Sequence, residues 1–592
     1  MSSLSRSDLL PEPSLRPGAE LIAEGRALAV DWRLGACPFL AEQGVVSEVD
    51  HKRQQAAAGQ VMLHAQIGYR DKAKTLEAAA GIHEATARRG RAVARYGICL
   101  DWSMGFPQAL RQGRPRGTGL ILEGPEDFVA LSHAAPVAPH FGDFVLGFPA
   151  ALENTQAALA AGATAIGNLG QYFTFRLPGW DDEVASTEAT LRALGLIAAQ
   201  PVQVLVHSNL DDGFAALFTD LCCVLGAVLI EQHIVDGLIG ARVSHCFGHH
   251  FSEPMTRAAF QCALAKVEDT PGTMVYGNTT SYRGGPAENY ASLGSYLLID
   301  ALGQSRWPSG HALNPVPVSE NERIPDIDEV IAAQLYAVRL LEQSEGHAVL
   351  IDWQAVEQLA DRLIEGGQLF KQRVLTGLTE AGIDTSDPME VLLALRRLGP
   401  RKLEALFGPG ALDADAPRGR QPTVEAPVVE ELAAMADACV GRWTAPEIAE
   451  VSAAGLRICV ATSDVHEHGK LLLEEVLRRL GAAPLDGGVS VDPDALVAAA
   501  VAQEVDALAI STYNGVALNF LRGVKAELAA RGLDIPILIG GRLNQIPDAS
   551  NSSLPVDVGD DLAAAGAIVC RDMEALLPAL LQHVIKEEPL RP

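Results

Sequence analysis

The stretch RICVATSDVHEHGK, residues 457–470, decides the fold of the C-terminal part of this chain. Its first half, RICVATS, is a short apolar run of the kind that forms a fully buried strand. This predicted strand leads directly into the spacing Asp464-x-His466-x-x-Gly469. Open α/β sheets bind their ligands at the carboxyl ends of such strands. We therefore expect these three residues to lie at a ligand-binding edge.

Three further apolar runs follow this stretch and alternate with amphipathic helical segments such as KLLLEEVLRRLG. The runs are DALAIST at 506–512, IPILIGG at 535–541 and AGAIVC at 565–570. Short strands that alternate with helices are typical of a parallel sheet covered on both faces. The sequence therefore predicts a flavodoxin-like, doubly wound parallel sheet over residues 455–592.

His466 and Asp464 have the residue types and spacing of a metal-binding imidazole with an orienting partner. Imidazole suits borderline transition metals, and a nearby carboxylate can accept the second ring N–H, which fixes the tautomer. Gly469 lets the backbone approach a bulky ligand. A pattern of three residues arises by chance in roughly one chain in ten of this size. The interpretation therefore depends also on the loops after Ser511 and Gly540, which leave the sheet at the same edge.

These residues resemble the cobalamin-binding fold shared by B12-dependent mutases and methyltransferases. The resemblance implies that His466 is the lower axial ligand of cobalt and that Asp464 hydrogen-bonds to its imidazole. It also implies that the cofactor's tail lies among residues of the same edge, namely Gly469, Ser511, Tyr513, Gly540 and Gly541. The family usually has Ser-x-Leu where this chain has Ser511-Thr512-Tyr513. His468 lies outside the motif spacing, and we interpret it as a surface residue at a helix start.

Upstream, residues 46–325 also alternate short apolar runs with Ala-rich helical stretches. The predicted strands are 61–68, 92–101, 117–124, 143–148, 164–168, 202–208, 241–248 and 272–278. About eight βα repeats over roughly 260 residues predict a TIM barrel, (β/α)8, whose active site lies at the carboxyl ends of its strands. Several predicted strands end in polar residues: Asn168, His207 with Ser208, His245 and Asn278.

Two segments fall outside these α/β domains. Residues 1–45 are expected to form an irregular arm with one helical piece near 19–30. Residues 326–445 are expected to form a helical region and a linker, because apolar residues recur at three- and four-residue spacing over 327–343 and 353–378. A Gly-, Pro- and Asp-rich stretch follows these predicted helices.

The composition limits the class of protein and its partners. The 592 residues include 46 Lys and Arg against 74 Asp and Glu, and the net charge of −28 argues against a nucleic-acid partner. No apolar run approaches the ~20 residues that cross a bilayer, and no secretory signal is visible, so we expect no membrane partner. The nine cysteines contain no C-x-x-C pair, and reduced thiols in the cytoplasm are expected.

The region before the cobalamin-like domain resembles the catalytic subunit of glutamate mutase (methylaspartate mutase). The resemblance runs over roughly residues 60–415 and is carried by three segments in the same order, 67–93, 281–303 and 404–410. It implies an adenosylcobalamin-dependent carbon-skeleton mutase with its catalytic barrel fused to a C-terminal B12 domain. The implied chemistry is homolysis of the Co–C bond, hydrogen abstraction by the deoxyadenosyl radical, and rearrangement of the substrate radical.

The substrate-holding segments differ from those of glutamate mutase. LGFPAALEN at 146–154 replaces an arginine-bearing stretch, and GNLGQYFTF at 167–175 places Asn168 and Tyr172 where the family has acidic and tyrosine contacts. HALNPVPVSENE at 311–322 has no clearly placed equivalent of the Lys and Glu that meet the adenosyl group. We therefore expect a small carboxylic acid or a related acyl compound other than glutamate.

Arginine is the residue type that binds a carboxylate with two parallel N–H groups, so Arg70 and Arg283 are the candidates to anchor the substrate. Weaker catalytic candidates are Tyr172, His207, His245 and Asn278.

Two other hypotheses stay open. A corrinoid methyltransferase would use methylcobalamin, and the helical region 326–445 could imitate the small helical bundle that precedes the motif in that family. A non-enzymatic cobalamin carrier or sensor would leave the polar strand ends of the barrel unexplained. The sequence leaves the direction of reaction and the assembly open, with a homodimer as one candidate.

Overall fold

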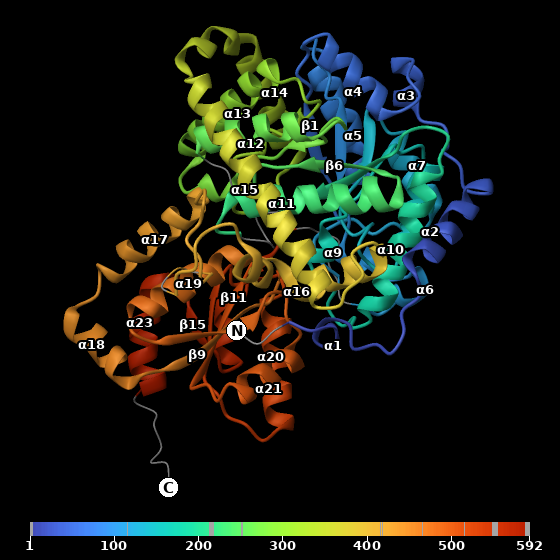
Figure 1. Ribbon diagram of the computed structural model, residues 1–592. Coiled ribbons are helices and arrows are strands. Elements are labelled where there is room, and N and C mark those ends of the chain that lie inside the picture. The colour runs from blue at the N-terminus through green and yellow to red at the C-terminus, as the bar shows by residue number, and fades with distance from the viewer. Residues whose placement is uncertain are drawn as a thin grey trace. The chain divides into compact units, whose positions relative to one another are not determined.

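The chain forms two compact units in the computed structural model (Figure 1). The structure describes residues 4–114, 116–211, 218–249, 253–414, 416, 418–464, 466–513, 515–547 and 554–585. The first unit comprises Met1–Thr174, Asp181–Asp212 and Phe218–Pro427, and the second comprises Phe175–Trp180, Gly213–Leu217 and Val428–Pro592. Both units are α/β structures with parallel sheets.

Within the residues that the structure describes, the first unit contains eight short strands, each followed by a helix. The strands are β1 (His64–Ile67), β2 (Arg95–Ile98), β3 (Ala138–Phe141), β4 (Ala165–Ile166), β5 (Leu205–Asn209), β6 (Arg242–Cys246), β7 (Met274–Val275) and β8 (Ala312–Leu313). The helices that follow them are α5 (Lys72–Ala87), α7 (Pro125–Ser132), α8 (Ala151–Ala160), α10 (Glu183–Ala198), α11 (Leu221–Gln232), α12 (Pro254–Val267), α13 (Pro286–Arg306) and α14 (Ile327–Ser344).

The strands of this unit are parallel and follow the order of the sequence. Strands β1 to β6 form one sheet, and β7 pairs with β8. Single parallel bridges join Phe247, just after β6, to Val275 of β7, and Leu63, just before β1, to Leu313 of β8. Strand β7 therefore lies next to β6, and β8 lies next to β1.

Helix α4 (Glu48–Ala57) covers the amino ends of several of these strands. Lys52 Nζ donates hydrogen bonds to the carbonyl of Thr273, which precedes β7, at 3.0 Å, and to that of Gly310, which precedes β8, at 2.9 Å. Val49 is fully buried against β4 and β5.

The structure differs from the sequence prediction at four places in the first unit. Segments 117–124 and 143–148 are not strands, because their apolar side chains are buried as loop anchors: Leu120, Leu122, Val145 and Leu146. Strand β3 was not predicted because Pro139 lacks the N–H group expected of a ladder residue. Strand β8 was not predicted because it is only two residues long.

The predicted arm and the predicted helical region as far as Pro427 belong to the first unit, whereas the rest of that helical region, 428–445, belongs to the second unit. Helix α2 (Gly18–Ala27) packs on α10, where a side chain at Gly25 would collide with the backbone of Arg192. Helix α15 (Trp353–Glu380) packs on α11 in the same close way, with Phe370 against Gly226. Helix α16 (Pro388–Phe407) also belongs to this unit. Glycines at these crossings let the helices approach closely. The predicted domain boundaries rested on local sequence patterns, which do not record such contacts between distant helices.

One segment of the described chain, Leu221–Ile239, is long and apolar enough to cross a membrane by length and composition. It consists of α11 and a π-helical continuation, and 72% of its apolar window is buried inside the protein. Core helices of soluble proteins pass the same test, so this segment is weak evidence for a membrane span.

The second unit is a parallel sheet with the strand order β10-β9-β11-β12-β15. The strands are β9 (Arg457–Thr462), β10 (Ala483–Gly488), β11 (Ala507–Thr512), β12 (Ile537–Gly541) and β15 (Ile568–Cys570). This is the flavodoxin-like order 2-1-3-4-5, in which the switch point lies between the first and third strands. The predicted strands at 457–463, 506–512, 535–541 and 565–570 are confirmed. Edge strand β10, with Pro and three Gly or Asp residues, was not predicted.

The helices of the second unit bury the sheet. They are α17 (Pro427–Val440), α18 (Ala445–Ala454), α19 (Glu467–Arg479), α20 (Pro493–Ala502), α21 (Ala517–Ala530), α22 (Gly559–Ala564) and α23 (Leu576–Ala579). Leu496, Leu521 and Leu562 from three of these helices are fully buried in one core with the strands β9, β11 and β12. A short antiparallel pair, β13 (Asn544–Gln545) with β14 (Val556–Asp557), lies outside the main sheet.

Candidate functional site

The Asp-x-His-x-x-Gly motif lies at the carboxyl end of β9, as the sequence predicts. Strand β9 ends at Thr462, and α19 begins at Glu467 with His466 as its N-cap residue. The His466 side chain is 13% exposed and that of Asp464 is 9% exposed, so the pair is shielded but within reach of a ligand. Residues Thr462, Ser511 and Gly540 stand in register on neighbouring strands at this edge.

The Asp464 carboxylate accepts hydrogen bonds from three described residues. Its Oδ1 accepts from the ring Nδ1 of His466 at 2.5 Å and from the His466 backbone N–H at 3.1 Å. Its Oδ2 accepts from the Tyr513 backbone N–H at 2.8 Å and from Ser463 Oγ at 3.2 Å. A carboxylate accepts only, so the proton of the neutral imidazole lies on Nδ1. The lone pair of His466 is then on Nε2, the nitrogen that could bind a metal.

The aromatic ring of Tyr513 stacks on the imidazole of His466. The ring centroids are 4.1 Å apart and the planes differ by 29°. Tyr513 is the first residue after β11, so its backbone is fixed by the strand as well as by Asp464. The predicted tail residue Tyr513 therefore contacts the predicted metal ligand itself.

Glycines allow close backbone packing at this edge. A Cβ on Gly469 would lie 2.6 Å from Ser511 Oγ. Gly541 has φ of +91°, in the left-handed region, and a Cβ there would collide with the Thr512 backbone. Gly540 pairs with Ser511 across the two strands. The structure thus brings all of the sequence-predicted cofactor residues to one edge of the second unit.

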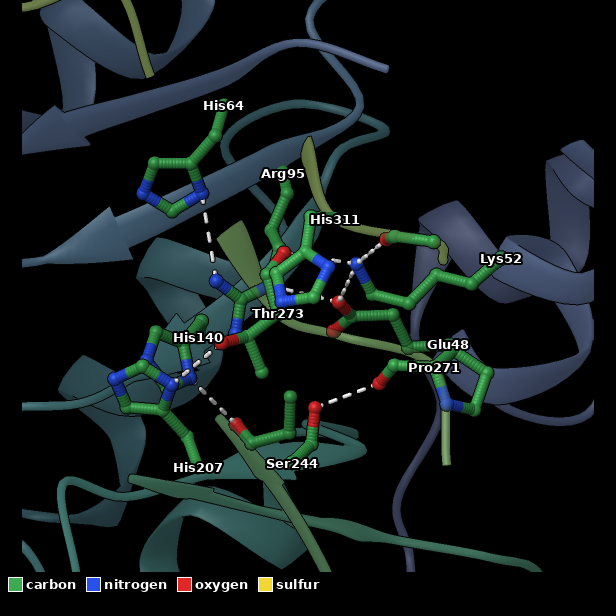
Figure 2. A network of polar contacts seen from close by, with 12 residues as sticks. Glu48, Lys52, His64, Arg95, His140, His207, Ser244, Pro271, Thr273 and His311 are labelled. Atoms are coloured by element: carbon green, nitrogen blue, oxygen red, sulfur yellow. Dashed lines mark hydrogen bonds and ion pairs between the residues drawn. The ribbon is translucent and has the colours of Figure 1, made fainter. Parts of the chain in front are cut away.

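His207 of the first unit belongs to a polar network in the interior of the sheet and not to its carboxyl edge. Its Nδ1 lies 2.9 Å from Thr273 Oγ1, and its ring meets that of His140 with centroids 4.4 Å apart (Figure 2). Asn209, not His207, is the last residue of β5. Burial lowers the pKa of both histidines well below the usual value, so they are neutral.

The same network holds buried charges from the covering helix α4. Arg95 Nε donates to Glu48 Oε1 at 2.7 Å, and Arg95 Nη1 lies 3.4 Å from His64 Nδ1 (Figure 2). Lys52 Nζ lies 3.5 Å from the same Glu48 oxygen. Burial lowers the pKa of Lys52 to about 8. These residues lie at the amino ends of the strands, which indicates a stabilising role.

His245 lies between two glutamates in the interior of the protein. Its Nε2 is 3.0 Å from Glu231 Oε2, and its Nδ1 bonds to Glu268 Oε1. Although burial opposes it, the charge of Glu268 and hydrogen bonds to both carboxylates raise the pKa of His245 to about 10. His245 is therefore a fully buried, ion-paired residue. Successive side chains of a strand point to opposite faces, so His245 lies on the face of β6 opposite to that of Ser244.

The other predicted residues of the first unit differ in burial. Arg70 is 3% exposed, follows β1, and donates from Nε to the Gly117 carbonyl at 2.8 Å. Arg283 is exposed and its Nε donates to the carbonyl of Thr280, in its own loop. Asn278 caps the same turn, accepting from the Thr280 N–H at 2.9 Å. Tyr172, on the short helix α9 (Gln171–Thr174), is 4% exposed.

A polar cluster that the sequence analysis missed lies at the carboxyl ends of β4 to β7. It consists of Asn168, Asn209, Asp211, His249 and Tyr276, of which only Asn168 had been noted. Asn209 Nδ2 lies 3.3 Å from His249 Nδ1, and the His249 ring stacks on Tyr276 with centroids 3.8 Å apart. Asn168 Oδ1 accepts from the Asn209 N–H at 2.8 Å.

Asp211 anchors the backbone of this cluster. Its Oδ2 accepts from the N–H groups of Gly248 at 2.6 Å and His249 at 3.0 Å. Nδ1 of His249 also lies 3.8 Å from Asp211 Oδ1, so the ring is held between an amide and a carboxylate. The cluster thus brings an imidazole, two side-chain amides and a carboxylate together at this edge. In the sequence, this cluster corresponds to polar residues at or after the ends of β5 and β6, whereas the predicted candidates, His207 and His245, lie within these strands.

Comparisons with known proteins give a partial match. No known family profile matches the sequence. A stretch of 84 residues is 33% identical to glutamate mutase sigma subunit 1 of Haloarcula marismortui, which covers 14% of this chain and 56% of that subunit. The chain thus spans just over half the length of the curated relative that it matches.

Two solved structures have low overall similarity to the whole chain. One is a cobalamin-binding protein from Desulfitobacterium hafniense, with 16% identity and a TM-score of 0.19, covering 41% of this chain and 97% of that one. The other is dihydrodipicolinate synthase from Agrobacterium tumefaciens, with 14% identity and a TM-score of 0.26, covering 57% and 99%.

Proposed function

We propose that this chain is a cobalamin-dependent carbon-skeleton mutase, an isomerase that uses adenosylcobalamin. The observation that carries the proposal is the Asp464–His466 pair at the carboxyl edge of the second unit, with His466 Nδ1 held 2.5 Å from the carboxylate. The similarity of an 84-residue stretch to glutamate mutase sigma subunit 1 supports the same assignment.

The residues at this edge fit a corrinoid, which needs one protein ligand because its ring supplies four nitrogens to cobalt. Among the residues that the structure describes, no group of three or more His, Cys, Asp and Glu side chains could hold a bare metal ion. His466 would hold the cobalt through Nε2, while Asp464 fixes the imidazole. The residues around the tail would be Gly469, Ser511, Tyr513, Gly540 and Gly541.

We interpret the first unit as the (β/α)8 catalytic barrel of this mutase. Its support is the sequential parallel order of the strands and the bridges that join β6 to β7 and β8 to β1. Active sites of such barrels lie at the carboxyl ends of the strands. The polar cluster around His249 lies at these ends and would form the substrate site.

When bound, adenosylcobalamin supplies the carbon radical that starts the rearrangement, and the chain's residues bind and orient the substrate. His249, with its ring held against Asn209 and Tyr276, would contact a carbonyl or carboxylate oxygen of the substrate. Arg70 would bind a carboxylate. Arg257, also near this cluster, is paired with Asp300 at 2.5 Å and cannot serve as a second anchor without breaking that pair.

This donor set suits a substrate with a carboxylate and a carbonyl oxygen. We therefore propose a small carboxylic acid or a related acyl compound other than glutamate. Arg283 is a weaker anchor than Arg70 because it is exposed, and exposed guanidinium groups bind carboxylates against the competition of water.

A second candidate is a corrinoid methyltransferase. Helices α17 and α18 directly precede the motif and belong to the same compact unit as its sheet, as a helical cap of a methyltransferase corrinoid module would. This function would use methylcobalamin and would transfer a methyl group without homolysis of the Co–C bond.

The test is to add adenosylcobalamin to the purified full chain and to record absorption and EPR spectra with pools of candidate acids and acyl compounds. We expect the cofactor to bind in the base-off form with histidine on cobalt, and one pool to elicit a paramagnetic cobalt–radical signal. His466→Ala should abolish the histidine-bound spectrum, whereas the matched control His468→Ala should retain it.

Binding through His466 without a radical signal from any pool would contradict the mutase and lead to methyl-transfer assays. Failure of the wild-type chain to bind any cobalamin would refute both candidates.

A further inference from the structure

We propose that Tyr513 is a positioning residue for the His466 imidazole, which it orients by stacking on the ring. The inference rests on the proposed function, in which His466 binds cobalt. Its geometric basis is the stack between the two rings, with centroids 4.1 Å apart and planes within 29°. Offset stacking of this kind is a favourable arrangement for two aromatic rings.

A single carboxylate holds both the imidazole of His466 and the backbone of Tyr513. Asp464 Oδ1 holds His466 through its Nδ1 and its backbone N–H, and Asp464 Oδ2 accepts from the Tyr513 backbone N–H at 2.8 Å. Tyr513 also follows directly on β11, which pairs with β9 and β12. The tyrosine backbone is therefore fixed, and its ring lies on one face of the imidazole.

A hydrogen bond and a stacked ring constrain different motions of an imidazole. The bond from Nδ1 to Asp464 fixes the position of one nitrogen, but the ring can still tilt about that point. A flat surface beside the ring restricts this tilt and so sets the direction of Nε2. Because a metal–imidazole bond lies along the Nε2 lone pair, we infer that Tyr513 favours one approach direction for the cobalt.

A leucine at position 513 would offer contact area to the imidazole but no flat ring face. The alternative is that Tyr513 contacts only the tail of the cofactor. The two roles can be separated because cobinamide is a corrinoid that lacks the nucleotide tail.

The experiment compares the wild-type full chain with Tyr513→Phe, Tyr513→Leu and Tyr513→Met. Each is titrated with cob(II)alamin and, separately, with cob(II)inamide, by absorption. The EPR splitting from a cobalt-bound nitrogen, recorded with cob(II)inamide because it has no nitrogen base of its own, gives the fraction of cofactor that carries the histidine. Thermal unfolding of each apoprotein shows whether it is folded. Two non-aromatic variants are used so that the comparison can still be made if one of them does not fold.

We expect Tyr513→Phe to behave as wild type. Tyr513→Leu and Tyr513→Met should bind both corrinoids roughly 3- to 10-fold more weakly, which is the range for loss of an aromatic pair, and should show a smaller nitrogen-split fraction. Unchanged binding and splitting in folded leucine and methionine variants would overturn the proposal.

A loss confined to cob(II)alamin would also overturn it, because that pattern is expected of a contact with the tail. Failure of the wild-type chain to bind either corrinoid would refute the proposed function instead, so the two failures are distinguishable.

Discussion

Gly469 lies directly against the side chain of Ser511, so that a Cβ at position 469 would stand 2.6 Å from Ser511 Oγ. Gly469 is in the first turn of α19, and Ser511 is in β11, next to the strand that leads into the motif. The glycine of the motif is therefore explained by a neighbouring strand as well as by a bound ligand.

Gly469→Ala should weaken cobalamin binding with little effect on stability. The new methyl group crowds the serine hydroxyl, which can rotate away at a small cost in stability. Alanine also improves helix propensity by about 1 kcal/mol, so these two effects on the free energy of unfolding nearly cancel. The displaced hydroxyl loses its contact with the tail, which corresponds to about a 5-fold loss of affinity. Cobalamin titration and urea unfolding measure the two effects. If the substitution lowers affinity equally in a Ser511→Ala background, this explanation is wrong.

Asp464→Asn should reduce cobalamin affinity by about 10- to 100-fold, the range for loss of an orienting partner of a metal-bound histidine. The amide can still accept from His466 Nδ1, but it lacks the charge that raises the basicity of Nε2. Titration by absorption measures the loss. The effect should disappear in a His466→Ala background, and a persistent effect there would show that Asp464 acts on the cofactor by another route.

Arg95→Met should lower the free energy of unfolding in urea by about 3–5 kcal/mol. It removes the hydrogen bond of 2.7 Å that Glu48 accepts and leaves Lys52, 3.5 Å away, as the ion-pair partner of this buried carboxylate, and removing one member of a buried ion-pair network is costly. The control Arg339→Gln removes an exposed pair with Glu342 and should change stability by less than about 1 kcal/mol. Equal effects of the two substitutions would contradict the role assigned to the network under α4.

His245→Gln should destabilise the protein in a pH-dependent way. The pKa of His245 is raised in the folded state from 6.5 to about 10, so the folded protein binds the proton more tightly than the unfolded chain. The stabilisation is therefore complete below pH 6.5 and is lost as the pH rises to 10. Unfolding midpoints of both proteins at about pH 6, 8 and 9.5 test this.

The difference in midpoint between wild type and His245→Gln should shrink steadily over that range. Lys52, with a pKa of about 8, titrates in the same window, but it does so in both proteins and cancels from the difference. A difference that stays constant with pH would show that His245 is not charged in the folded protein.

His249→Ala should lower the turnover of the substrate found by the pool experiment by at least about 100-fold, the lower range for a positioned polar group in catalysis. Its cobalamin affinity should stay unchanged, because the substitution alters none of the residues proposed to hold the cofactor, which are Asp464, His466 and the residues around the tail. His133→Ala, which removes an exposed histidine of the same unit, is the matched control. A loss of cobalamin affinity in His249→Ala would contradict this assignment.

Much of the fold could be predicted because its signals are local. The strand RICVATS, the helix after it and the alternation of strands with helices depend on neighbouring residues, which hydrophobic periodicity records. The prediction was wrong at 117–124 and 143–148, where apolar side chains such as Leu120 and Val145 are buried without a ladder. It missed β3 because a proline in a short strand removes the local signal.

The candidate site in the second unit could be predicted because its chemistry is contained in a few adjacent positions. Asp464 and His466 are two residues apart, and their hydrogen bond follows from the turn between β9 and α19. The stack of Tyr513 on His466 joins residues 47 positions apart by sequence number, and no local pattern announces it.

The sequence by itself determined the strand–motif–helix order and the pair of residue types that could hold a cobalt. Only the tertiary structure decided the roles of the histidines in the first unit. His245 meets Glu231 and Glu268, whereas His207 meets Thr273, 66 residues away. The physical reason is that a strand turns successive side chains to opposite faces, so a shift of one residue changes every partner, and those partners come from distant parts of the chain.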